Sequence, residues 1–125
     1  MKLDIKEIPR KFNVGVDQSI TISDMGQVDL DTNEQLTFIT PQGAETDIVR
    51  KEWGFYATGS LNGRLPEHNL RVALTVNKQN RYYIMLVEHG FEEAFETYIN
   101  EEDNALICWL DDKSLKKIQN IFAED

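Results

Sequence analysis

Cysteine, histidine and long apolar runs are all scarce in this chain. It contains one cysteine, Cys108, and two histidines, His68 and His89. A single cysteine cannot form an internal disulfide, and a zinc site needs three or four His, Cys or carboxylate ligands. No stretch approaches the about 18 apolar residues that cross a bilayer, and residues 1–12 lack the apolar run of a signal peptide. We therefore predict a cytoplasmic protein with no bound metal, no cofactor and no membrane partner.

Positive charge is also in short supply. Thirteen Lys and Arg stand against 22 Asp and Glu, which gives a net charge of −9. This sign opposes binding to nucleic acid, so no nucleic-acid partner is expected. Residues 88–112 hold acidic side chains and no Lys or Arg: Glu88, Glu92, Glu93, Glu96, Glu101, Glu102, Asp103, Asp111 and Asp112. They form either a solvated face that keeps the protein soluble or a docking face for a basic partner.

The three prolines and seven glycines are scattered singly along the chain. No Pro/Gly/Ser-rich linker therefore divides it. A length of 125 residues fits one domain, and a hydrophobic content of 41% is ordinary for a folded protein. We predict a single domain that covers residues 1–125.

The first half of the chain consists of short β-prone runs separated by turn-forming residues. Strands are expected near residues 27–30, 35–40 and 45–51, arranged as a meander. The tripeptide at 41–43, Pro-Gln-Gly, has the residues that close a tight turn, so 35–40 should pair with 45–51.

Three strands are predicted in the second half. Residues 70–76 alternate apolar and polar side chains, which is typical of a strand with one solvent-exposed face. Residues 81–87 are bulky on both faces, so we expect them in the interior of the sheet. Residues 105–110 form a continuous apolar run, which favours a strand covered on both faces.

Two amphipathic helices complete the predicted fold. Between residues 91 and 99 the apolar side chains recur at helical spacing: Phe91, Ala94, Phe95, Tyr98 and Ile99. A second helix near 113–122 should begin at Asp112 or Ser114, either of which can act as its N-cap. The sequence thus predicts an α+β protein: a mainly antiparallel sheet of about 7–9 short strands with two short helices.

The sequence lacks the motifs of several common functions. The run Asp29-x-Asp31-x-Asn33 begins like a calcium loop. However, Glu34 stands where that loop needs glycine, and Thr40 stands where it needs a bidentate glutamate. There is no GxSxG elbow, phosphate-binding loop or dinucleotide fingerprint.

The segment at residues 53–65, WGFYATGSLNGRL, is the candidate binding site. Its glycines allow close approach of a ligand, its arginine and asparagine offer planar donors, and its aromatic rings offer stacking surfaces. In the alternative interpretation, the aromatics pack in the core and the glycines only turn the chain. The predicted ligand-binding residues, which include a histidine just after the segment, are Trp53, Tyr56, Ser60, Asn62, Arg64 and His68.

This segment, together with RYYIMLVE and CWLDD further along the chain, resembles a family of small uncharacterised bacterial proteins. The family is associated with gene clusters for surface-polysaccharide and nucleotide-sugar biosynthesis, and the resemblance covers roughly residues 18–112. It implies a bacterial cytoplasmic accessory protein. It implies no cofactor and no catalytic residue.

Three functions remain open at this point. The first is a non-catalytic accessory domain that recognises a small polar ligand, such as a sugar or nucleotide sugar, or a partner protein through residues 53–65. The second is an enzyme acting on a sugar or sugar nucleotide, with His68, Arg64 and a carboxylate such as Glu67 as its acid–base group. The third is a homo-oligomeric structural protein that pairs exposed sheet edges.

Overall fold

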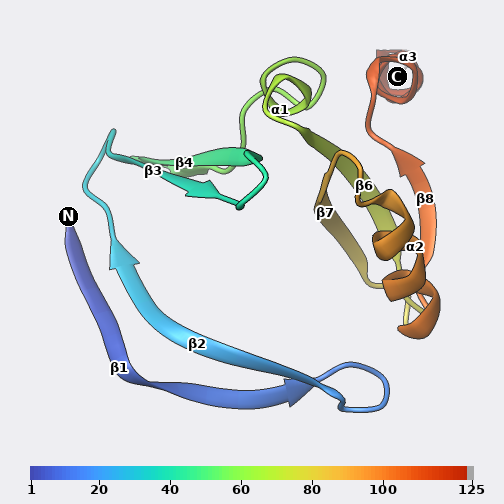
Figure 1. Ribbon diagram of the computed structural model, residues 1–125. Coiled ribbons are helices and arrows are strands. Elements are labelled where there is room, and N and C mark those ends of the chain that lie inside the picture. The colour runs from blue at the N-terminus through green and yellow to red at the C-terminus, as the bar shows by residue number, and fades with distance from the viewer. Residues whose placement is uncertain (124–125) are drawn as a thin grey trace. The chain divides into compact units, whose positions relative to one another are not determined.

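The computed structural model describes residues 1–123, which fold into eight strands and three short helices (Figure 1). The predicted α+β class is confirmed, and all the strand pairings given below are antiparallel. The strands are β1 (Lys2–Val14), β2 (Ile20–Asp29), β3 (Gln35–Ile39), β4 (Glu45–Lys51), β5 (Gly54–Tyr56), β6 (Leu70–Val76), β7 (Tyr82–Glu88) and β8 (Ala105–Trp109). The helices are α1 (Arg64–Glu67), α2 (Glu92–Glu101) and α3 (Asp112–Ala123).

The chain forms two compact units, which are described separately. The N-terminal unit contains Met1–Leu36 and Ile48–Ala57, and the C-terminal unit contains Thr37–Asp47 and the chain from Thr58 onward. The division falls within β3 and β4. The single domain expected from composition stays a prediction.

In the N-terminal unit, β1 and β2 form a two-stranded ribbon of their own. Figure 1 shows them side by side in the blue part of the chain. The pairing is interrupted by a bulge on β1 between Ile5 and Arg10, where Pro9 cannot donate a ladder hydrogen bond. The expected meander is wrong, because residues 27–29 form the end of β2 and β2 pairs with β1, not with β3. The predicted pairing of 35–40 with 45–51 is confirmed, and β5 extends that sheet beyond β4.

The C-terminal unit is built on a three-stranded sheet in the order β7-β6-β8. Its core lies on the face of β6 that carries Leu70 and Val72, which pack with Ala44, Leu65 and Leu110. Leu65 comes from α1 and is 1% exposed, so this short helix is held on the sheet by its one buried side chain. Its four residues make it too short to be stable alone.

The opposite face of β6 is not solvent-exposed, contrary to the expectation from its alternating pattern. Ala73 and Thr75 are both fully buried there. Trp109 pairs with Ala73 and contacts Phe95 of α2, so α2 lies on this face. Small side chains on β6 leave room for the helix, which explains how a moderately polar strand face becomes buried.

The order of the strands also corrects two predictions. Residues 81–87 were expected in the sheet interior, but β7 is an edge strand in which Tyr82, Tyr83 and Ile84 are exposed. Residues 105–110 were expected to be covered on both faces, but β8 is the other edge, with Ile107 47% exposed.

The two predicted helices are present, with α2 displaced by one residue from the expected start. Helix α3 is capped by Asp111, whose Oδ1 accepts a hydrogen bond from the backbone N–H of Ser114 (3.0 Å). The expected caps, Asp112 and Ser114, instead lie inside the helix. The single turn α1 was not predicted. Within residues 1–123 no helix is long and apolar enough to cross a bilayer.

Candidate functional site

The six predicted binding residues are divided between the two units. Trp53 and Tyr56 belong to the N-terminal unit, where Trp53 is 72% exposed and borders a small cavity of about 240 Å³ with Thr32, Asn33, Lys51 and Glu52. Ser60, Asn62, Arg64 and His68 belong to the C-terminal unit. The two groups of residues are therefore described separately.

Ser60 shapes the turn that leads into α1. Its Oγ accepts a hydrogen bond from the backbone N–H of Arg64 (2.7 Å), and its carbonyl accepts one from the N–H of Leu65 (3.1 Å). Two glycines allow this close packing. A Cβ on Gly63 would lie 2.6 Å from the Ser60 Oγ, and one on Gly59 would lie 2.9 Å from the Cδ of Arg64. Ser60 is thus occupied in forming the loop.

Arg64 is paired with a carboxylate of β4. Its Nε donates to Oδ2 of Asp47 (2.9 Å), whose side chain is 12% exposed, while that of Arg64 is 49% exposed. Asp47 also accepts a hydrogen bond from the hydroxyl of Thr37 (2.7 Å). The Thr37 hydrogen bond, followed by the Arg64 guanidinium, holds the pKa of Asp47 below its ordinary value. Arg64 is therefore engaged within the fold.

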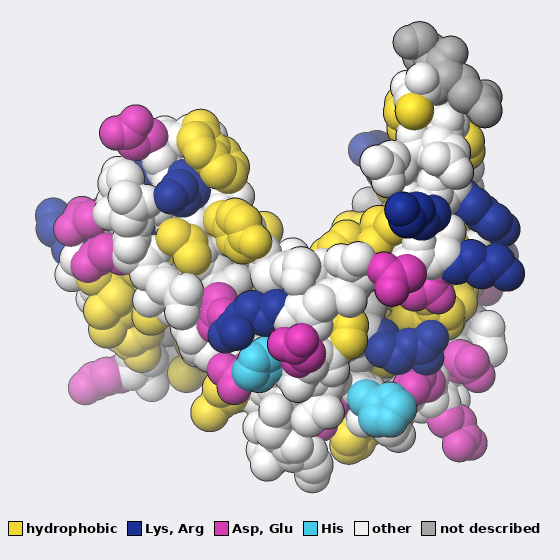
Figure 2. Space-filling view, turned by 90° about the horizontal axis from the view of Figure 1, so that it is seen from above, with side chains coloured by type: hydrophobic (Ala, Val, Ile, Leu, Met, Phe, Trp, Pro, Cys, Tyr) yellow, Lys and Arg dark blue, Asp and Glu magenta, His cyan; other side chains and the backbone are white. Residues whose placement is uncertain are grey.

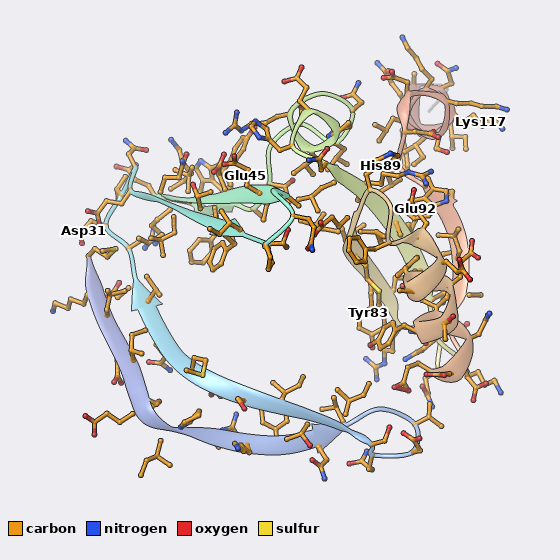
Figure 3. All side chains as sticks on the ribbon, viewed as in Figure 1. Asp31, Glu45, Tyr83, His89, Glu92 and Lys117 are labelled. Atoms are coloured by element: carbon orange, nitrogen blue, oxygen red, sulfur yellow. The ribbon has the colours of Figure 1, made fainter. Side chains whose placement is uncertain are left out.

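His68 lies one helical turn after Arg64 and contacts the second carboxylate on the same strand. Its Nδ1 is 3.2 Å from Oε1 of Glu45, and the backbone N–H of Glu45 donates to the His68 carbonyl (3.3 Å). Figure 3 labels Glu45 at the beginning of β4. The carboxylate beside His68 is thus Glu45, not Glu67 as the enzyme hypothesis supposed.

The other side of the same loop borders a cavity of about 310 Å³. Asn62 is the one predicted site residue that lines it. Its lining is mostly apolar with a few polar groups, which is the usual composition of a small-molecule pocket. The lining residues are Leu61, Asn62, Pro66, Arg71, Val72, Trp109, Leu110, Asp111 and Asp112.

A planar cation forms part of the cavity wall. The guanidinium of Arg71 stands over the ring of Trp109, and its Nη1 donates to Oε2 of Glu92 (3.2 Å). Figure 3 shows Glu92 and His89 near the start of α2, and their Oε2 and Nδ1 atoms are 3.6 Å apart. The hydrogen bond from the backbone N–H of Gly90 is the main cause that keeps the pKa of Glu92 below its ordinary value, and the Arg71 guanidinium acts in the same direction. Arg71 is therefore fixed by a ring on one side and an ionised carboxylate on the other.

Two carboxylates and an amide provide the hydrogen-bonding groups of the cavity. The amide nitrogen of Asn62 donates to Oδ1 of Asp112 (2.7 Å), which joins the loop to the start of α3. Hydrogen bonds from Ser114 lower the pKa of the neighbouring Asp111. Each carboxylate keeps a second oxygen that can accept a hydrogen bond from a ligand.

Arg71, Trp109, Asp111 and Asp112 were not singled out from the sequence as site residues. The usable signal was the position of Asp111 and Asp112, between an apolar strand and an amphipathic helix, because polar groups at such junctions often line sites. Arg71 carried no comparable signal, since one charged residue in a strand pattern normally faces solvent. Within residues 1–123, no three His, Cys, Asp or Glu side chains are grouped closely enough to hold a metal ion.

The acidic segment at residues 88–112 is partly paired within the C-terminal unit. Glu92 binds Arg71, and Lys78 lies 3.6 Å from Asp103. Figure 2 shows acidic, basic and hydrophobic side chains interspersed on the face that it displays. A docking role for this segment stays a prediction.

Comparison of the chain with protein families, with curated proteins and with solved structures found no match. The functional argument therefore rests on the geometry of the cavity.

Proposed function

We propose that the protein is a non-catalytic accessory domain that binds a small neutral sugar in the 310 Å³ cavity beside Asn62 and Trp109. The observation that carries this proposal is the composition of the wall. Apolar side chains can cover the carbon face of a sugar ring, while Asn62, Asp111 and Asp112 can accept hydrogen bonds from its hydroxyl groups.

The charges of the cavity favour a neutral ligand over a nucleotide sugar. Asp111 and Asp112 are adjacent carboxylates on the wall, and the chain as a whole carries −9. A diphosphate group would be repelled by both. Among residues 1–123, Arg71 is the one cation that lines the cavity, and its charge is already balanced by Glu92.

The carboxylates of the cavity favour binding over catalysis. Sugar hydrolysis requires a general acid, and a carboxyl group that serves as one has a raised pKa. The pKa of Asp111 is lowered. Asp111 is therefore suited to accept hydrogen bonds as a carboxylate and not to donate a proton. The resemblance expected from the sequence, which no comparison supports, sets only the order of the tests, with sugars first.

The experiment is a ligand-observed NMR screen of neutral monosaccharides and nucleotide sugars, followed by titration of each hit. Asn62→Ala should weaken binding of a neutral sugar about tenfold because it removes the side-chain amide, and Asp112→Asn should do so because it replaces one acceptor oxygen with an NH2 donor. Asn100→Ala, an exposed change on α2 outside the cavity, is the matched control and should leave the affinity unchanged.

Arg64→Ala separates this cavity from the loop site that the sequence suggested. It should lower stability while leaving sugar affinity unchanged, since Arg64 contacts Asp47 and does not line the cavity. Binding of nucleotide sugars alone, or loss of binding with Arg64→Ala but not with Asn62→Ala, would contradict the proposal. A turnover product in the screen would establish the enzyme instead.

A further inference from the structure

The β1–β2 ribbon of the N-terminal unit has one mainly apolar and one mainly polar face, and the exposed Met25 alternates along β2 with the polar positions. Residues opposite each other in an antiparallel pair project from the same face. The apolar positions include the opposite pairs Leu3 with Val28, Phe12 with Ile22 and Val14 with Ile20, and also Ile5, which faces Gly26. The polar pairs that alternate with them are Lys2 with Asp29, Asp4 with Gln27, Lys11 with Ser23 and Asn13 with Thr21. Along β2 the apolar positions keep the two-residue period of a single strand face.

This apolar face is exposed. The exposed fractions of Leu3, Ile5, Phe12, Ile22 and Val28 are 57%, 59%, 37%, 41% and 41%. Figure 3 shows side chains projecting from both faces of the ribbon. A two-stranded hairpin is marginally stable by itself in water, so a ribbon of 13- and 10-residue strands requires cover on its apolar face.

The charge pattern of the face is self-complementary. Arg10 and Asp24 are opposite each other, with the guanidinium 3.5 Å from the carboxylate, and lie between the apolar pairs at the two ends. A two-fold axis that runs along the ribbon between its strands would place Arg10 of each copy against Asp24 of the other. It would also place the apolar pairs at each end of the ribbon on the same pairs of the partner, with β1 side chains over β2 side chains.

The edge of β1 is less suited to pairing with another chain. It carries Pro9 and a bulge, and the strand contains several lysines: Lys2, Lys6 and Lys11. Proline, bulges and lysines are the devices that natural edge strands use to prevent pairing. A partner is therefore better accommodated on the face of the ribbon than along β1.

The area of the face matches that of a dimer interface. The exposed fractions correspond to on the order of 450 Å² of apolar surface. Because interfaces are roughly 60% apolar, this implies about 750 Å² per partner, close to the ~800 Å² of a standard interface. We propose that the apolar face of the β1–β2 ribbon is the interface with a second copy of this chain, packed face to face about a two-fold axis that runs along the ribbon between its strands, beside Arg10 and Asp24.

The first test is the oligomeric state of the full chain, measured by sedimentation velocity and light scattering at roughly 1–100 µM, a range that brackets affinities of standard interfaces. The wild-type chain should be a dimer. Ile22→Glu and Val28→Glu, at the two ends of the apolar face, should each weaken dimerisation at least tenfold. Ser23→Glu and Gln27→Glu add the same charge to the polar face and should leave the dimer intact. Far-UV circular dichroism verifies that each variant retains its strands.

The second test distinguishes contact between copies from the ion pair within each ribbon. Arg10→Glu and Asp24→Arg should each give monomers, because like charges would then meet across the axis. An equimolar mixture of the two single variants should form a heterodimer. In that heterodimer the introduced glutamate of one copy faces the introduced arginine of the other, and the unchanged Asp24 faces the unchanged Arg10. Native mass spectrometry resolves the heterodimer from both homodimers.

Three results would overturn the proposal. They are a monomeric wild-type chain over the whole concentration range, a dimer that survives either Ile22→Glu or Val28→Glu, and a mixture of the charge variants that stays monomeric. A monomeric wild-type chain would mean that the apolar face binds something other than a second copy. A dimer that survives the substitutions would mean that the interface lies elsewhere on the chain.

Discussion

The guanidinium carbon of Arg71 lies 3.8 Å from the centre of the Trp109 ring. The ring of Phe95 is packed against the same indole, with 5.7 Å between ring centres and 53° between planes. Residues from β6, β8 and α2 therefore meet at one side chain, which borders the cavity. The contact is within the range in which a cation and an aromatic ring attract each other by about 1 kcal/mol.

Replacing Arg71 tests the strength of this arrangement. Arg71→Met keeps an unbranched apolar stem but removes the planar cation and the hydrogen bond to Glu92. We expect a loss of about 1–2 kcal/mol in the free energy of unfolding, from the combined cation–π and charge-assisted contacts of a partly exposed residue. Urea denaturation followed by tryptophan fluorescence measures it. Arg81→Met, an exposed change before β7, is the control and should cost under about 0.5 kcal/mol.

Gly63 and Ser60 should show strongly non-additive energetics. Gly63→Ala alone brings a Cβ to 2.6 Å from the Ser60 Oγ, so the serine must abandon its bond to the N–H of Arg64. We expect that change to cost about 1–2 kcal/mol.

Removing the Ser60 hydroxyl should relieve the clash with a Cβ at residue 63. The nearest remaining atom would then be the Cβ of residue 60, which is 3.6 Å from that Cβ, an ordinary contact distance. Gly63→Ala should therefore cost under about 0.5 kcal/mol when made in Ser60→Ala, and the double-mutant cycle reports the difference. Equal costs in both backgrounds would show that the hydroxyl does not determine the need for glycine.

The stability of the protein should depend on the ionisation of Asp47 at low pH. Its pKa in the folded chain lies below the ordinary value of 3.8, mainly because Thr37 donates to it. A carboxyl group with a lowered folded pKa stabilises the fold above its unfolded pKa, and that contribution is lost as the pH falls through the folded pKa. The free energy of unfolding should therefore decrease as the pH is lowered below about 4.

Thr37→Val should make this decrease shallower, since it removes the largest cause of the pKa shift. Thr32→Val, at an exposed position in the N-terminal unit, is the matched control and should retain the slope of the wild-type chain. Urea midpoints between about pH 2 and pH 5 give both slopes. Parallel slopes for the wild-type and Thr37→Val proteins would contradict the assignment.

Local periodicity was sufficient to predict the type of most elements but not the position of strands in the sheet. The pattern of β6 indicated one exposed face, yet Ala73 and Thr75 are buried beneath a helix that follows them by some twenty residues. Conversely, the bulky residues of β7 include Tyr82, 65% exposed on an edge strand. Hydrophobicity records how well a side chain tolerates burial, whereas strand order depends on pairings distant in sequence.

The candidate site shows the same limit of prediction from local sequence patterns. The segment at 53–65 was recognised from its glycines, polar residues and aromatic rings, and Asn62 does line the cavity. The partners that occupy Arg64 and His68 come from β4, 17 and 23 residues earlier, and no local pattern links them. Asp112, the partner of Asn62, is 50 residues away. Those contacts decide which loop residues are available, so the sequence could locate the loop without assigning its side chains.

Two side-chain contacts join β4 to α1 and the residue that caps it: the ion pair of Arg64 with Asp47, and the contact of the His68 Nδ1 with the Glu45 carboxylate. Arg64 and His68 are four residues apart, and in a helix this spacing corresponds to a rise of about 6 Å. Asp47 and Glu45 are two residues apart on a strand, a rise of about 6.7 Å. The two spacings nearly coincide, so both contacts can form at the same time in only one alignment of the helix against the strand. Inserting or deleting one residue in either element would misalign both contacts at once, so this part of the chain should tolerate substitutions far better than changes of length.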